Sequence, residues 1–175
     1  MEDLQYPIGK FKWDGRASEE QLRQWIDEIA AAPARLRAAV KGLSPQQIDT
    51  PYRPGGWTVR QLVHHVPDSH LNSYMRFRLA LTEQEPTIKP YDQDRSAQLP
   101  DSRTAPLEVS LSLLESLHER WVLLLRSLTA ADWKRTFRHP ELGVVKLEGT
   151  AALYAWHGRH HVAHITSLRL RKGWT

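Results

Sequence analysis

The chain carries nine histidines and no cysteine. Four of the histidines fall within one stretch of eight residues: His157, His160, His161 and His164. Residues four apart on a helix share a face, so His157 and His161 can direct two imidazoles at one point. Such a pair supplies half of a metal site. Because the chain has no thiolate, the remaining ligands would be histidine, aspartate or glutamate.

A second polar group lies in residues 63–70, which contain His64, His65, Asp68 and His70. If this segment faces the first one, a histidine from it completes a three-histidine site with an open position. That ligand set is typical of catalytic zinc, since structural zinc is normally closed by four protein ligands. Three neutral ligands leave the ion its full charge, which lowers the pKa of a bound water or thiol.

Known metal motifs with a built-in base are absent from the sequence. Gly158 follows His157, so this pair lacks the His-Glu-x-x-His motif of metalloproteases, and Glu148 is too far from His157 to form the Glu-x-x-His pair of di-iron bundles with it. Asp68 is the nearest carboxylate, and we expect it to orient a ligand or act as a base, with a plain surface aspartate as the alternative. His164 is the second candidate base.

The other histidines are weaker candidates for a site. We expect His64 and His70 to be exposed or to lie behind the ligands, and His160 to pack or to support a ligand. His118 and His139 carry no accompanying pattern, so we expect both to be incidental.

Periodic apolar positions and capping residues predict four long helices that must position these groups. They span about 18–41, 58–82, 106–127 and 150–172, and Ser18–Gln21 and Thr58–Gln61 fit the capping box. Pro33 is expected to kink or restart the first helix, and Pro67 to bend the second beside His65. Residues 136–147 suggest a small β-hairpin. We therefore predict one all-α domain over residues 1–175, a four-helix bundle with long crossover loops. Tyr91 and Asp92, in the loop 84–104, are expected to close over the site.

Composition limits the classes of function. The net charge of +4 and the pI near 9.5 reflect dispersed basic residues, so a nucleic-acid partner has no supporting motif. The first residues lack the pattern of a signal peptide and no segment is apolar enough for a membrane span, so a cytoplasmic protein is expected.

Several motifs together resemble the DinB-like superfamily of four-helix bundles and, within it, the bacillithiol transferase family, also described as metal-dependent hydrolases. The resemblance covers essentially the whole chain and rests on residues 6–9, 50–53, 57–65, 68–70, 72–74, 89–92, 157–161 and 173–174. It implies a homodimer and one zinc or nickel ion held by His65, His157 and His161. It also implies transfer of a low-molecular-weight thiol to electrophiles.

Arg76 and Arg159 are candidates for binding carboxylates of such a thiol cofactor. The first alternative is a hydrolase that uses metal-bound water, with Asp68 or His164 as the base. The second alternative is a non-catalytic metal- or ligand-binding stress protein.

Overall fold

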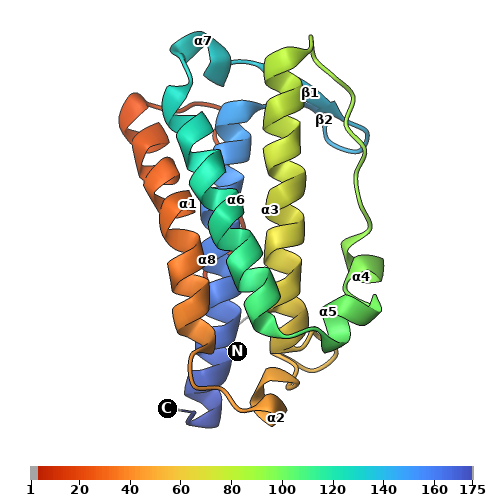
Figure 1. Ribbon diagram of the computed structural model, residues 1–175. Coiled ribbons are helices and arrows are strands. Elements are labelled where there is room, and N and C mark those ends of the chain that lie inside the picture. The colour runs from red at the N-terminus through yellow and green to blue at the C-terminus, as the bar shows by residue number, and fades with distance from the viewer. Residues whose placement is uncertain (1–3, 175) are drawn as a thin grey trace.

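The structure, a computed structural model, describes residues 4–174, and long helices make up most of them (Figure 1). The long helices are α1 (Glu19–Val40), α3 (Val59–Thr82), α6 (Leu107–Ser127) and α8 (Leu147–Lys172). The connections contain α2 (Pro45–Ile48), α4 (Gln93–Ser96), α5 (Pro100–Thr104), α7 (Ala130–Trp133) and the antiparallel strands β1 (Thr136–His139) and β2 (Gly143–Lys146). The predicted four-helix bundle and hairpin are confirmed. Within this part of the chain, no helix is long and apolar enough to cross a membrane.

Local sequence signals set most helix ends. Ser18 and Thr58 each form a capping box with the glutamine three residues on, which satisfies backbone N–H groups that have no partner inside the helix. Helix α8 begins at Leu147, before the predicted Thr150, because the Leu147 N–H donates to the Arg135 carbonyl directly after β2. Pro33 does not end α1, which continues through it to Val40.

The path of the chain places the two histidine-bearing helices against each other. In Figure 1, α1 and α8 run in one direction and α3 and α6 in the other, so α3 and α8 are antiparallel neighbours. The crossover 83–106 returns the chain along the bundle from the end of α3 to the start of α6, whereas 128–146 joins α6 to α8 at one end (Figure 1).

The bundle interior contains two apolar clusters with a layer of histidines between them. One cluster includes Phe77, Trp121 and Leu147, and the other includes Leu62, Leu114 and Ile165. The positions between them on α3, α6 and α8 hold the largely buried rings of His65, His70, His118, His157 and His161. A buried polar ring is costly unless its nitrogens have partners, so the contacts of this layer decide what it can do.

Candidate metal centre

Three imidazole nitrogens converge between α3 and α8. His157 Nε2 lies 3.4 Å from His65 Nε2 and 3.2 Å from His161 Nε2. Zinc with nitrogen ligands at about 2.0–2.1 Å in a tetrahedral arrangement separates neighbouring nitrogens by about 3.3–3.4 Å. These two separations match that spacing, and the three ligand nitrogens all lie within 4.8 Å of one another, so the rings fit a zinc-sized ion.

Burial keeps these three rings neutral. It lowers the pKa of His65 to about 4, and burial together with the neighbouring imidazoles holds the pKa of His157 and His161 well below the ordinary value. A neutral imidazole offers a lone pair to a metal, whereas an imidazolium cannot. The donor chemistry thus agrees with the geometry: these residues fit a divalent ion.

The outer nitrogen of each ring has a partner of its own. His65 Nδ1 lies 3.4 Å from the Tyr91 hydroxyl, His157 Nδ1 lies 3.1 Å from His70 Nε2, and His161 Nδ1 lies 3.3 Å from His164 Nδ1. Histidine ligands of metals are normally oriented by such outer hydrogen bonds. Each ring is therefore held with Nε2 directed at the common centre.

The contact behind His161 also defines where its proton lies. His164 Nε2 is 3.0 Å from the Gln5 carbonyl oxygen, which can only accept, so this nitrogen of His164 carries the hydrogen. In a neutral ring His164 Nδ1 is then an acceptor and His161 Nδ1 donates to it. This leaves the lone pair of His161 on Nε2, which faces the centre.

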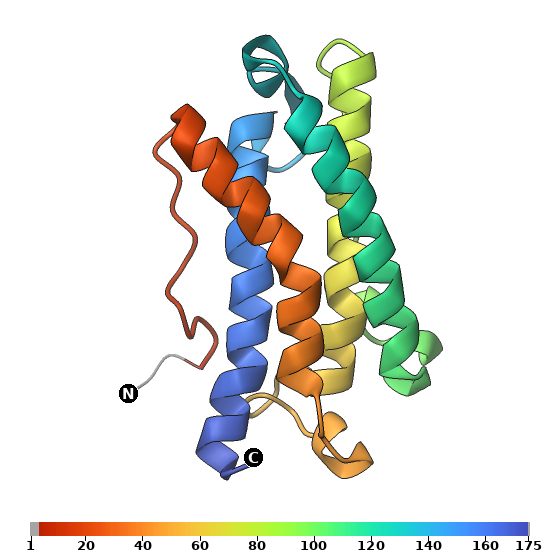
Figure 2. The same cartoon turned by 60° about the vertical axis from the view of Figure 1, so that its left-hand side comes forward.

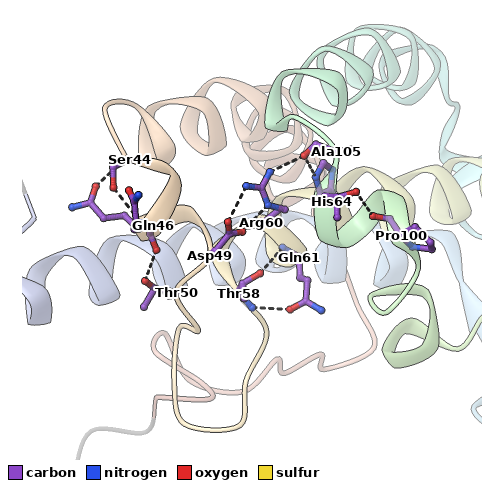
Figure 3. Close-up of polar contacts among 12 residues, drawn as sticks. Ser44, Gln46, Asp49, Thr50, Thr58, Arg60, Gln61, His64, Pro100 and Ala105 are labelled. Carbon is purple, nitrogen blue, oxygen red and sulfur yellow. Dashed lines mark hydrogen bonds and ion pairs between the residues drawn. The ribbon is translucent and has the colours of Figure 1, made fainter.

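A polar clamp fixes the start of α3, one turn before His65 (Figure 3). The Arg60 guanidinium donates to both carboxylate oxygens of Asp49, at 2.7 and 3.1 Å, and to the Ala105 carbonyl at 2.8 Å. The His64 ring binds the same carbonyl at 3.1 Å and the Ser110 hydroxyl at 2.7 Å. Two connections and α6 are thereby attached to the first turns of the helix that carries His65.

A close approach of α1 and α8 sets the position of the second ligand helix. A Cβ added at Gly158 would lie 3.1 Å from the Ala32 Cβ, tighter than ordinary packing. The residue after His157 is therefore glycine for a packing reason, and α8 lies directly against α1 at the level of the site.

A cavity of about 390 Å³ opens onto the three rings. Its wall includes the aromatic rings of Tyr52, Trp57 and Trp156, the cation Arg53 and the carboxylate of Asp94. The N-terminal segment, which runs beside α8 in Figure 2, also contributes to it. The volume lies within the usual range for small-molecule sites. A ligand here would touch the metal centre, aromatic surface and one arginine.

The sequence-predicted residues are distributed unevenly around this cavity. His65, His157 and His161 lie together at its base, and His164 lies directly behind His161. Asp68 is half-buried on α3 but does not line the cavity, and burial and Asp101 raise the pKa of its carboxyl. The loop 84–104 reaches the site, since Tyr91 contacts His65.

Neither of the predicted arginines lines the cavity. Arg159 is exposed and lies 3.7 Å from the Glu28 carboxylate of α1. Arg76 is half-buried on α3, near enough to Tyr91 and Tyr154 to lower their pKa values slightly against the larger effect of burial. The arginine that lines the cavity is Arg53, in the loop before α3, and it occupies the place predicted for Arg76 and Arg159.

Two buried histidines lie behind the site: His70, which the sequence places either at the surface or behind the ligands, and His118, for which it predicts no role. His70 and His118 are 0% and 2% exposed, and their rings are in contact with each other. His118 is not a surface residue, because α6 turns it into the interior of the bundle, where it bonds to His70. Five residues separate His70 from His65, which places His70 on a different face of α3, toward α6. No local signal marks His118.

Comparisons with known proteins show the family of this chain. The profile described as the DinB superfamily matches residues 28–165. The chain belongs to the DinB superfamily. A relative from Bacillus mycoides, named "Putative metal-dependent hydrolase", is 59% identical over 99% of this chain and 100% of its own length. A relative from Bacillus anthracis with the same name has the same identity and coverage.

Two solved structures share the four-helix bundle fold. YfiT from Bacillus subtilis, described as a probable metal-dependent hydrolase with an unusual four-helix bundle topology, is 51% identical. It superposes with a TM-score of 0.96 over 98% of this chain and 99% of YfiT. The four-helix bundle protein TT2238 is 21% identical with a TM-score of 0.57 over 81% of this chain and 94% of its own, and it supports the fold alone.

Proposed function

We propose that the protein is a metal-dependent enzyme that transfers a low-molecular-weight thiol to electrophilic small molecules. The observation that carries the proposal is the set of three neutral imidazoles whose Nε2 atoms converge at the base of an open cavity. We propose zinc or nickel as the ion, held by His65, His157 and His161. When bound, such an ion stabilises the thiolate form of a thiol at neutral pH.

The groups around the cavity favour thiol transfer over hydrolysis. Free water is far less acidic than a free thiol (pKa of about 15.7 against about 8.5), so hydrolysis gains more than thiol transfer does from a nearby base whose pKa is near the working pH. Both nitrogens of His164 face partners, Asp68 lies outside the cavity, and the pKa of His160 is lowered to about 4 by burial. A thiol that is already ionised needs none of these groups.

The side chains of the cavity then bind and orient the reactants. Trp57 and Tyr52 cover the side of the centre and exclude water, and Arg53 can pair with a carboxylate of the thiol. The thiolate sulfur forms a bond to the electrophilic carbon, and the leaving group departs with the electrons of the bond that breaks. A thiol with several carboxylates, such as bacillithiol, suits this site. Arg76 and Arg159 stay alternative carboxylate partners, and the homodimer stays a prediction.

Metal-assisted hydrolysis is the second candidate, and the names of the relatives favour it. In that case water takes the place of the thiol, and Asp68 or His164 is the proposed base. The third candidate is a protein that binds a metal or another ligand without catalysis.

Turnover of 1-chloro-2,4-dinitrobenzene by zinc-loaded protein separates these candidates. With bacillithiol or cysteine present, we expect the dinitrophenyl thioether and chloride to form above the uncatalysed rate. His161→Ala should lower that rate by roughly 100-fold, since loss of even an outer partner costs about 10–100-fold, while His139→Ala, remote from the cavity, should not. Metal-dependent cleavage of a test ester without thiol, and no rate increase with thiol, would overturn the proposal in favour of hydrolysis.

A further inference from the structure

A continuous chain of hydrogen bonds crosses the bundle behind the metal centre. His118 Nδ1 on α6 lies 2.6 Å from the Ile29 carbonyl of α1, His118 Nε2 lies 2.8 Å from His70 Nδ1 on α3, and His70 Nε2 lies 3.1 Å from His157 Nδ1 on α8. One side chain or carbonyl from each long helix takes part. Since His70 and His118 are buried, water does not compete for these bonds.

The carbonyl end of the chain fixes the position of every proton in it. A carbonyl oxygen only accepts, so His118 Nδ1 carries its hydrogen. A neutral imidazole has one N–H, so His118 Nε2 accepts from His70 Nδ1, and His70 Nε2 in turn accepts from His157 Nδ1. The lone pair of His157 is then on Nε2, which faces the metal centre.

Pro33 explains why the carbonyl at the end of this chain is available. In an uninterrupted helix the N–H of residue 33 would bond to the carbonyl of residue 29. Proline has no N–H, so the Ile29 carbonyl is left without a partner inside α1 and accepts from His118 instead. A proline in the middle of a long helix, costly in itself, thereby supplies the acceptor that the histidine chain requires.

We propose that His70 and His118 are positioning residues that hold His157 in its Nδ1–H tautomer. Pro33 frees the Ile29 carbonyl, at which this chain of hydrogen bonds ends. The role in metal binding rests on the proposed function, whereas the tautomers themselves do not. Without the chain, His157 can place its proton on Nε2, and that proton would have to leave before a metal binds.

Long-range ¹H–¹⁵N NMR of the metal-free protein, labelled at histidine and held near pH 7.5, tests the proposal directly. We expect His70, His118 and His157 each to carry a single proton on Nδ1. A proton on Nε2 of any of the three would overturn the proposal, whether or not the protein binds metal. If the tautomers are as expected and the wild-type protein binds no zinc, the positioning chain stands and the proposed function falls.

Variants give an independent readout through zinc affinity, measured by competition with a chromophoric chelator. His118→Phe keeps an aromatic ring but removes both nitrogens, and we expect a mixture of His157 tautomers and zinc binding weakened by about 10–100-fold. His118→Gln retains an oxygen that can accept from His70 and should recover most of the affinity. Pro33→Ala restores a competing N–H and should weaken binding to a smaller extent.

His139→Phe is the matched control, because His139 is also buried but lies in the β1–β2 hairpin, and it should change neither readout. Folded His118→Phe with the wild-type tautomer at His157 and unchanged zinc affinity would contradict the proposal. If His118→Phe does not fold, the tautomers of the wild-type protein still decide.

Discussion

At the scale of single residues, the site depends on which nitrogen each imidazole presents. His157 and His161 are four residues apart, and this spacing alone predicts that they share a face. It does not predict that both present Nε2. That property comes from His70 and His164, which take up the two outer nitrogens. The ligand pair could therefore be predicted from the sequence, and His70 could be suspected behind it, but the nitrogens that these rings bind could not be predicted.

Arg53 is the residue whose charge should select the thiol. Its side chain lines the wall of the cavity. Arg53→Met should therefore raise KM for a carboxylate-bearing thiol by roughly 10-fold, which corresponds to the loss of about 1.4 kcal/mol from one charge-assisted hydrogen bond. KM for 2-mercaptoethanol, which has no carboxylate, should hardly change. Arg159→Met is the comparison variant, and a larger effect there would assign the anion site to Arg159 instead.

At the scale of secondary-structure elements, the sequence predicts the helices well and their contacts poorly. The capping residues Ser18 and Thr58 act locally, so their helices begin where the sequence predicts. The sequence predicts that Pro33 kinks or restarts its helix. Its effect in the structure is to free the Ile29 carbonyl, which accepts from His118 on α6, 89 positions further along the sequence. The crossover 83–106 likewise contains two short helices that no periodic pattern marks.

The clamp at the start of α3 should contribute measurably to stability. The Arg60 side chain is largely buried, and its hydrogen bonds to Asp49 hold the pKa of that carboxyl below its usual value. Arg60→Met should lower the free energy of unfolding by about 1.5–3 kcal/mol, because it removes hydrogen bonds that involve charged groups. Urea denaturation measures this change.

Arg126→Met is the control for this clamp. Arg126 forms an exposed ion pair with Asp27 at 3.4 Å, and such pairs contribute about 0–1 kcal/mol. Equal losses in the two variants would show that the Arg60 clamp is no stronger than a surface ion pair.

At the scale of the whole molecule, the buried histidine layer makes stability depend on pH. Burial lowers the pKa of His65 and of His118 to about 4 in the folded protein, against about 6.5 when unfolded. Between these values the unfolded chain binds more protons than the folded one, so stability falls as the pH falls from 6.5 toward 4. Each such ring contributes up to about 1.4 kcal/mol per pH unit.

Urea unfolding of metal-free protein at pH 7.5, 6 and 5 tests this dependence. Wild-type stability should decrease steeply below pH 6.5, and the slope for His118→Phe should be smaller by about 1.4 kcal/mol per pH unit, the share of one ring. A profile that is flat over this range would mean that the rings are already protonated, or solvated, in the folded state.

The central claim is that His65, His157 and His161 hold one metal ion at the base of the cavity. Metal analysis of the purified protein beside its His65→Ala and His161→Ala variants tests it most directly. We predict about one zinc or nickel ion per wild-type chain and, in both variants, a loss of bound metal consistent with two remaining ligands. Retention of the wild-type metal content by both variants would contradict the three-histidine site.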